Sequence, residues 1–309
     1  IDGAVGSSRR VWVTIRETLV LLCIAIGLTP AFKMKFWNIG AEGQILMGGM
    51  ATAALMIYAG DAMPNWLLLI LIFIASAAAG LIWGLIPAVF KAYFNTNETL
   101  FTLMLNYVAM QLVTFAIVFW ENPSGSNTVG IINAAGQKGW FPSIFGNMYG
   151  LNVIVVLIIT LGMYVYMKYS KQGYEIAVVG ESQNTARYAG INVKKVIIRT
   201  MMLSGAICGI AGCLIVSGAS HTISTSTAGG RGFTAIIVAW MSKFNPFAMI
   251  LVSAFLVFMQ QGSIQIASQF GLNENASDII TGILLFFLIG CEFFINYKLE
   301  WKKNHKEGK

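Results

Sequence analysis

The chain has 309 residues, of which 57% are hydrophobic and only 11% are charged. A soluble domain of this length could not bury so much apolar surface, so the composition excludes a soluble protein and predicts a polytopic membrane protein. The formal net charge of +7 is concentrated in residues 171–199 and 298–309. Such basic segments are typical of loops on the cytoplasmic side, with the anionic bilayer and not a nucleic acid as their partner.

Apolar runs long enough to cross a bilayer predict the helices, since about 20 residues are needed for one crossing. In chain order the predicted spans cover residues 18–32, 44–59, 66–90, 99–120, 151–167, 196–217, 246–267 and 279–297. Residues 233–241 are apolar but too short to span, and they predict a half-helix. Small residues such as Gly48, Gly80, Gly205 and Gly209 recur in these runs and favour close helix packing. The predicted fold is an all-α, polytopic transmembrane helical bundle with broken half-helices, formed by residues 1–297 and followed by a basic cytoplasmic tail, 298–309.

The basic loops also predict the orientation of the bundle. The segments expected inside are 33–35, 91–98, Lys243, 168–199 and the tail, and the segment expected outside is 121–150. Residues 1–17 then fall outside although they contain Arg9, Arg10 and Arg16, which conflicts with the rule. A further helix upstream of Ile1 would resolve the conflict; removal of such a segment by processing is the alternative.

A polar segment, residues 171–195, interrupts the apolar chain. Ser182 is an N-cap residue for about two helical turns, Gly190 lies where a helix ends in a left-handed residue, and Asn192 can cap the next helix. A helix this short is marginal alone in water and needs a surface to rest on. The segment therefore predicts a rigid cytoplasmic element that docks a soluble partner.

Two further interruptions predict unwound backbone within the membrane. Residues 36–44 read Phe-Trp-Asn-Ile-Gly-Ala-Glu-Gly-Gln and join two short runs, and residues 224–232 precede the half-helix. Unwound backbone at membrane depth must be buried in protein or line a cavity, and its helix N-termini point toward a substrate. Paired interruptions indicate an inverted-repeat transporter core. An ordinary cytoplasmic turn with a solvated Glu42, and an exposed polar loop over 224–232, are the alternatives.

Polar side chains near or within the spans are candidates for a solute pathway, because polar groups in a membrane usually face a cavity or each other. The candidates are Asn38, Glu42, Gln44, Asn106, Gln111, Ser226, Thr227 and Gln261. Amides and hydroxyls suit a neutral polar solute better than a zwitterion or a phosphate. Glu98 and Glu292 lie near predicted cytoplasmic ends, where snorkelling or an interfacial ion pair accounts for them.

Enzyme and metal signatures are missing from the sequence. It contains no Gly-x-x-x-x-Gly-Lys-Ser/Thr phosphate loop, no His-Glu-x-x-His pair and no Gly-x-Ser-x-Gly elbow. The four cysteines lie in apolar runs without metal-ligand spacing. The chain is therefore not expected to be an enzyme or to bind a metal or a cofactor itself. An intramembrane Ser–Lys or Asp–Asp hydrolase is the alternative that the pattern leaves open, but Asp2, Asp61 and Asp278 all lie at or beyond the ends of predicted spans.

With these residues in view, the chain resembles the permease subunits of bacterial ABC importers of the branched-chain amino acid/ribose permease superfamily, in its nucleoside and simple-sugar branch. Four stretches carry the resemblance: residues 36–44, residues 97–107 (Asn-Glu-Thr-Leu-Phe-Thr-Leu-Met-Leu-Asn-Tyr), residues 174–193 with the core Gly-Glu-Ser-Gln-Asn-Thr-Ala-Arg-Tyr-Ala-Gly-Ile, and Gly-Arg-Gly-Phe-Thr-Ala-Ile-Ile-Val-Ala-Trp at 230–240 followed by Asn-Pro. The resemblance implies a type II ABC importer permease in the bacterial plasma membrane.

The resemblance also implies partners and a cargo. A second permease subunit, related but different, would complete the pathway; two cytoplasmic ATPases would use ATP; an extracytoplasmic binding protein would deliver the solute. The length and the Gly, Ser, Asn and Pro content of residues 121–150 predict an exposed segment that faces this binding protein, with Trp140 and Phe141 as anchors; a solvated loop is the alternative. The capped element would be the coupling helix, with ATPase contacts from Glu181, Ser182, Asn184, Arg187, Tyr188 and Gly190. The expected cargo is a nucleoside first and a simple sugar second. An ion-coupled secondary transporter for a small polar solute is the alternative that the residues alone leave open.

Overall fold

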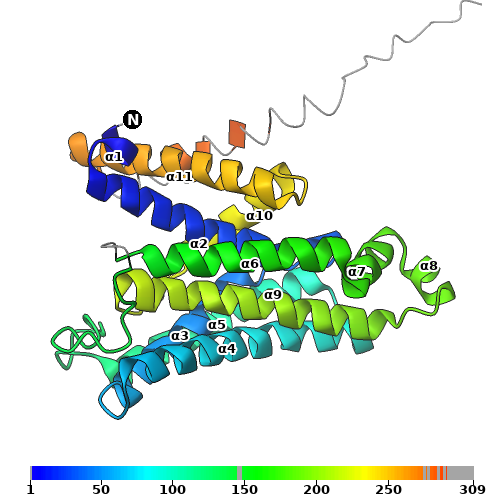
Figure 1. The fold of residues 1–309 in the computed structure, drawn as a ribbon, viewed down its shortest axis with the longest axis horizontal. Coiled ribbons are helices and arrows are strands. Elements are labelled where there is room, and N and C mark those ends of the chain that lie inside the picture. Colours follow the sequence, from blue (N-terminus) through cyan, green and yellow to red (C-terminus); the bar gives the residue numbers. More distant parts are fainter. Residues whose placement is uncertain are drawn as a thin grey trace, which may run out of the picture. The chain divides into compact units, whose positions relative to one another are not determined.

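The computed structural model describes residues 2–144, 148–273, 276, 279–283, 286, 287 and 290. They form two compact units: Ile15–Ala254, and a second that joins Ile1–Thr14 to the described residues from Phe255 onward. All regular elements in the described ranges are helices (Figure 1). The described residues leave out most of the predicted span 279–297, with Glu292, and the whole tail 298–309. The structure therefore does not test what the sequence predicts for them.

The helices follow the predicted runs. They are α1 (Asp2–Val5), α2 (Ser8–Lys33), α3 (Ala41–Ala59), α4 (Asn65–Phe94), α5 (Glu98–Trp120), α6 (Gly150–Tyr169), α7 (Lys171–Glu181), α8 (Gln183–Tyr188), α9 (Val193–Ile215) with a π-helical continuation η1 (Val216–Ser220), α10 (Arg231–Met241) and α11 (Pro246–Gln269). Among the described helices, α2, α4, α5, α6, α9 with η1, and α11 are long and apolar enough to cross a membrane. The multi-pass helical architecture and the short α10 are thereby confirmed.

The start of α2 and the presence of α7 differ from the prediction. α2 begins at Ser8 and not near residue 18, because Arg16 and Glu17 pair with each other inside the bundle and do not end the helix. α7 was not predicted, since its composition is polar; it folds because Ile176 and Val179 are buried against the neighbouring helix ends.

α9 packs against both α3 and α4 through glycines. A Cβ at Gly80 of α4 would overlap the carbonyl group of Gly205, and a Cβ at Gly48 of α3 would overlap the backbone of Gly209. Such contact lets backbones approach closely where lipid supplies no hydrophobic drive for helix association. The predicted role of these small residues is confirmed, and α9 becomes the central helix of the Ile15–Ala254 unit.

We expect Gly209→Ala to lower the free energy of unfolding by about 1 to 3 kcal/mol, because the new methyl group would overlap the Ser76 carbonyl group of α4. Gly162→Ala on α6 is the matched control, since its Cβ would meet nothing within 4 Å. The control should be neutral or slightly stabilising. Denaturant titration of the full chain in detergent measures both, and equal effects of the two substitutions would contradict the glycine contact.

The loops gather at two ends of the Ile15–Ala254 unit. At one end, α7 and α8 pack with the C-terminal end of α2 and the start of α9 around a buried cluster that includes Met34, Ile176 and Val196 (Figure 1). At the other end, the 121–149 loop is bound to the helix ends by Ile132 N, which donates to His221 O at 2.8 Å. The segments predicted on the two sides of the membrane are thus separated in space; which end faces the cytoplasm stays a prediction. Glu98 forms an ion pair with Lys91 at 2.8 Å, as expected of an interfacial carboxylate.

Two aromatic side chains bind the 121–149 loop to the bundle, and one of them corrects the sequence analysis. Phe141, expected as an exposed anchor, is only 8% exposed and stacks on Phe73 with ring centroids 5.5 Å apart. Trp140 stacks on His221 at 3.7 Å and donates its Nε1–H to Ile132 O at 2.9 Å. Burial lowers the pKa of His221, with Arg16 adding to the effect, so the stacked ring is neutral at pH 7. Both aromatics fasten the loop to the bundle. The buried Phe141 is therefore no exposed anchor, whereas the role of the half-buried Trp140 as an anchor stays a prediction.

Candidate functional site

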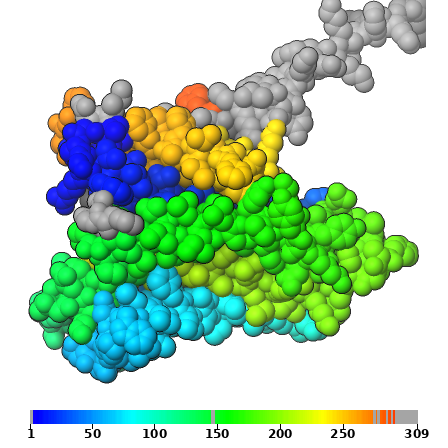
Figure 2. Space-filling model, in the orientation of Figure 1, coloured from blue at the N-terminus to red at the C-terminus, as the bar shows by residue number. Residues whose placement is uncertain are grey.

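The short helix α8 stands out from its end of the bundle, at the right of Figure 2. Ser182 Oγ accepts a hydrogen bond from Thr185 N at 3.2 Å, Gly190 has φ +76°, and Asn192 Oδ1 accepts from Lys195 N at 3.1 Å. All three predicted caps are confirmed. Ala186 is the inward-facing residue of α8, and Tyr188 is 93% exposed.

The predicted contact residues lie on the outer surface of this element. Ser182 is half-buried, and the exposed ones are Glu181, Asn184, Arg187, Tyr188 and Gly190. α7 connects this surface to the bundle: Gly180 lies so close to the Lys33 carbonyl group that a Cβ would overlap it. Lys33 ends α2 and immediately precedes the chain break, so α7 packs directly beside that break.

A break between α2 and α3 is confirmed, but it covers residues 34–40 and not 36–44, because α3 already begins at Ala41. Backbone groups of the break have partners from α5. Asn106 Nδ2 donates to Ile39 O at 2.9 Å, and Asn106 Oδ1 accepts from Gly43 N at 2.9 Å. Thr102 Oγ1 accepts from Ile39 N at 3.2 Å. Unwound backbone within a membrane needs such partners, because no water is available to it.

The two predicted interruptions meet in space at Glu42, in the first turn of α3. Its Oε1 accepts a hydrogen bond from Gly232 N, in the first turn of α10, at 2.7 Å. Gly232 also lies against α3, since a Cβ there would come within 2.8 Å of Glu42 N. The N-termini of two helices therefore converge, and a carboxylate compensates their positive dipole ends. Glu42 is 9% exposed, so the solvated-turn alternative is wrong.

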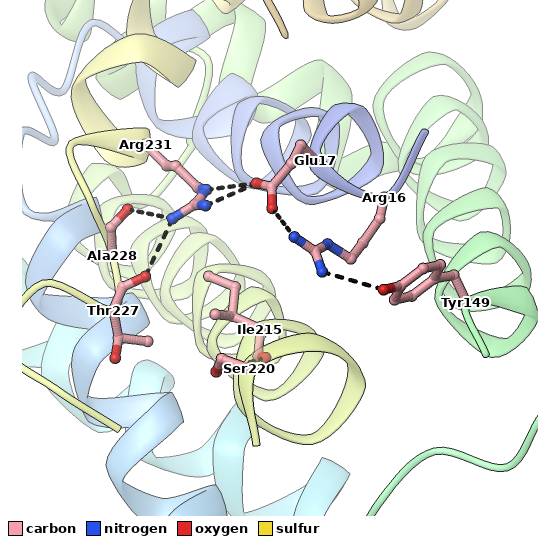
Figure 3. Close-up of polar contacts among 8 residues, drawn as sticks. All are labelled: Arg16, Glu17, Tyr149, Ile215, Ser220, Thr227, Ala228 and Arg231. Carbon is pink, nitrogen blue, oxygen red and sulfur yellow. Dashed lines mark hydrogen bonds and ion pairs between the residues drawn. The ribbon is translucent and has the colours of Figure 1, made fainter. Parts of the chain in front are cut away.

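A second carboxylate holds α10 from the side of α2 (Figure 3). Arg231 donates from Nε and Nη2 to Glu17 Oε2 at 3.0 and 2.7 Å, and Arg16 Nη2 lies 2.5 Å from Glu17 Oε1. Arg231 Nη1 also donates to the carbonyl groups of Thr227 and Ala228 at 3.3 Å each. The Arg16 guanidinium in turn reaches the Tyr149 hydroxyl at 3.5 Å. We call Glu17, Arg16 and Arg231 the arginine clasp; it ties α2 to the start of α10.

Two cavities adjoin the segment that leads into α10. One, of about 230 Å³, is lined by Glu42, Asn106, Tyr107, Ser226 and Phe233, among others. The other, of about 250 Å³, is lined by the arginine clasp together with Ser226 and Thr227. Ser226 lines both, so the loop that carries it separates the first cavity from the second.

The predicted pathway residues are thus partly brought together. Glu42, Asn106 and Ser226 share one cavity, and Thr227 lines the other. Asn38 and Gln44 are fully buried, their amides bond to each other at 3.4 Å, and Asn38 Nδ2 also donates to Ser204 Oγ at 3.3 Å. Gln111 lies exposed on α5, and Gln261 lies on α11 in the second unit. A role of any of these eight residues in a pathway stays a prediction.

Sequence reasoning missed Glu17, Arg231 and Tyr107. Glu17 and Arg231 are 214 positions apart, and their charges were assigned to loops, so only the fold pairs them. Tyr107 is 61% exposed at the cavity wall, directly after Asn106 in the quoted stretch 97–107. The signal that could have found the pair was the presence of two opposite charges beside predicted helix interruptions.

The chain matches known proteins over most of its length. A family model described as "Branched-chain amino acid transport system / permease component" matches residues 13–289. The chain is 29% identical to the guanosine ABC transporter permease protein NupP of Bacillus subtilis, over 93% of this chain and 83% of that protein. It is 28% identical to the glucose ABC transporter permease protein TsgB13 of Haloferax volcanii (91% and 76% covered) and 26% identical to the nucleoside ABC transporter permease protein NupB of Lactococcus lactis (96% and 83% covered). No solved structure matches the chain.

Proposed function

The chain belongs to the family of permease components of branched-chain amino acid transport systems, and on this premise we propose that it imports nucleosides as one subunit of an ATP-driven transporter. It is a multi-pass membrane permease of the ABC type, with six described helices able to span the plasma membrane. The family match sets aside the ion-coupled secondary transporter. What we propose beyond the family is the nature of the solute and the subunit composition of the transporter.

The position of Glu42 carries the proposal on the solute. Two helix N-termini converge at the cavity, and such an arrangement would attract an anionic group if it were left uncompensated. Glu42 already occupies that position, with Oε1 at 2.7 Å from Gly232 N, so a carboxylate or phosphate on the solute would meet a like charge. A neutral polar solute avoids this repulsion. The named relatives act on guanosine, nucleosides and glucose, which are all neutral.

The cavity wall favours a nucleoside over a sugar. Tyr107 and Phe233 are 61% and 45% exposed there, and each presents a ring that could stack on a base. Hydroxyls of Thr225 and Ser226 lie beside them and could hydrogen-bond a ribose. A simple sugar is the second candidate. It can hydrogen-bond to the same hydroxyls, but it has no aromatic base to stack on the rings of Tyr107 and Phe233.

The partners follow from the two ends of the bundle and from one of its sides. One of two ATPases would dock on α8 of this chain, and the pair would use the ATP, with no cofactor bound by this chain itself. A binding protein would deliver the solute to the end that carries the 121–149 loop. A second permease subunit, related but different, would cover α5, whose Met104, Phe115 and Phe119 are more than 60% exposed. Gln111 lies exposed on the same helix, and a polar group there fits a shared pathway better than lipid.

Uptake by the assembled transporter in proteoliposomes tests the proposal. We expect ATP on the side of the membrane that carries the ATPases to drive accumulation of radiolabelled guanosine. Proton or sodium ionophores should not reduce this accumulation. Unlabelled adenosine should compete and glucose should not. Glucose uptake that nucleosides do not compete for would overturn the nucleoside assignment.

The docking role of α8 predicts a strong effect of charge reversal at Arg187. Because α8 is a six-residue helix with few contacts to offer, Arg187→Glu should weaken ATPase copurification and coupled ATP hydrolysis about ten-fold. Membrane insertion should not change. Lys138→Glu, in the loop at the opposite end, is the matched control and should copurify normally. Normal copurification and hydrolysis with Arg187→Glu would remove α8 as the docking element.

A further inference from the structure

A groove at the α7–α8 end of the bundle has no role in the function proposed above. It has a volume of about 530 Å³, within the range of ligand sites, and lies between the ends of α2 and α6 and the turn that links α10 to α11. Its rim carries Lys33, Lys168 and Lys243, one from each of these elements. The residues that make the groove are distant in sequence, so only the tertiary structure forms it.

The charge of the groove is uncompensated. The lining residues include no carboxylate, and among the described residues none of the three lysines forms an ion pair. Lys168 Nζ is held in place, since it donates to Tyr164 Oη at 2.9 Å and lies 5.4 Å from the ring centroid of Tyr169. Asn245 and the first turn of α11 complete the rim and add a helix N-terminus to the three cations.

The groove changes from charged to apolar along its depth. Ile26 lies seven residues before Lys33 on α2, about 10 Å along the helix axis, and Met163 lies five residues before Lys168 on α6, about 7.5 Å. Outward from the groove, Val165 of α6 and Leu251 of α11 are 53% and 74% exposed. A cationic rim above an apolar floor, beside an apolar outer surface, matches a phosphate headgroup followed by the first carbons of an acyl chain.

We propose that this groove binds the headgroup of an anionic phospholipid. Three lysines from different elements neutralise the phosphodiester, and Lys168, fixed by Tyr164, supplies a preorganised donor. The bound lipid bridges α2, α6 and the α10–α11 turn, and so stabilises α10, which the arginine clasp holds at its other end.

Native mass spectrometry of the full chain in neutral detergent tests the proposal with phosphatidylglycerol and phosphatidylcholine of identical acyl chains. We expect one phosphatidylglycerol to be retained at least about ten-fold more strongly than phosphatidylcholine. The variant Lys33→Gln/Lys168→Gln/Lys243→Gln should lose this preference. The control Lys35→Gln/Lys194→Gln/Lys195→Gln removes the same charge at the same end, outside the groove, and should keep it.

Three outcomes would overturn the proposal. If the two triple variants lost the preference for phosphatidylglycerol equally, the preference would reflect only the general attraction of a basic surface for anionic lipid. Retention of the preference by the groove variant would place the lipid elsewhere. Displacement of the lipid by inorganic phosphate at millimolar concentration would identify a small-anion site instead. Thermal unfolding of both variants in phosphatidylcholine checks their folding; if the groove variant is unfolded there, the single substitution Lys243→Gln, on the exposed turn, should still lower the preference several-fold.

Discussion

Replacing Asn106 with leucine is expected to lower the free energy of unfolding by about 2 to 6 kcal/mol, because two buried backbone groups each lose a partner at about 1 to 3 kcal/mol. The groups are Gly43 N and Ile39 O, both at 2.9 Å from the Asn106 amide. Asn106 is 4% exposed, so water cannot replace the amide. Titration of the full chain with denaturing detergent measures the loss.

Asn152→Leu is the matched control. Asn152 is a buried asparagine on α6, and neither of its amide atoms has a hydrogen-bond partner among the described residues. Leucine of similar size there should be neutral or stabilising, since it removes an unsatisfied polar group. Equal destabilisation by the two substitutions would contradict a specific role of Asn106 in holding the broken segment.

Replacing Arg231 with methionine is expected to lower solute uptake about ten-fold or more, because loss of the arginine clasp frees the start of α10 at the cavity. The substitution leaves Glu17, which is 14% exposed, with Arg16 as its remaining cation. The cost in unfolding free energy should be about 1 to 3 kcal/mol, below that of a fully buried pair. Uptake of labelled guanosine is measured in parallel with ATP hydrolysis. Loss of uptake alone would indicate a gating defect, and loss of both would indicate loss of assembly.

Two variants complete this experiment. Arg231→Lys keeps the charge but loses the two-point contact with Glu17, and it should retain more uptake than the methionine variant. Arg199→Met breaks the other arginine–glutamate pair, with Glu175 at 3.0 Å, in a more exposed setting, and should cost less than about 1 kcal/mol. Full uptake by Arg231→Met would exclude the clasp from transport.

The two carboxylates together indicate how the half-helix is controlled. Glu42 holds the N-terminus of α10 through Gly232 N, and Glu17 holds it through the Arg231 side chain. At the end of the unit that carries α8, Gly180 of α7 packs against Lys33, which precedes the break at residues 34–40. The break leads directly to Glu42. ATPase movement at α8 would therefore act on one of the two attachments of α10 and leave the clasp as the second.

The sequence by itself determined the helical class, most spans and the local caps, because these depend on short-range signals. Apolar length specifies a crossing wherever it occurs, and Ser182, Gly190 and Asn192 act on backbone groups within three residues of themselves. The short α10 and a break after the first span were also predicted, the break at 36–44 and not at 34–40, since glycine and polar residues interrupt an apolar run locally.

Only the tertiary structure decided which polar residues face one another. Asn38 bonds to Gln44 and to Ser204, and Glu17 and Arg231, 214 positions apart, form the clasp. Phe141 likewise was expected as an anchor but is buried and stacks on Phe73. The physical reason is that a polar or aromatic residue in a membrane bundle must find a partner somewhere, while the sequence specifies the need and not the partner. Close packing of α3, α4 and α9 through their glycines selects the partner, because it sets which helix faces lie within hydrogen-bonding distance.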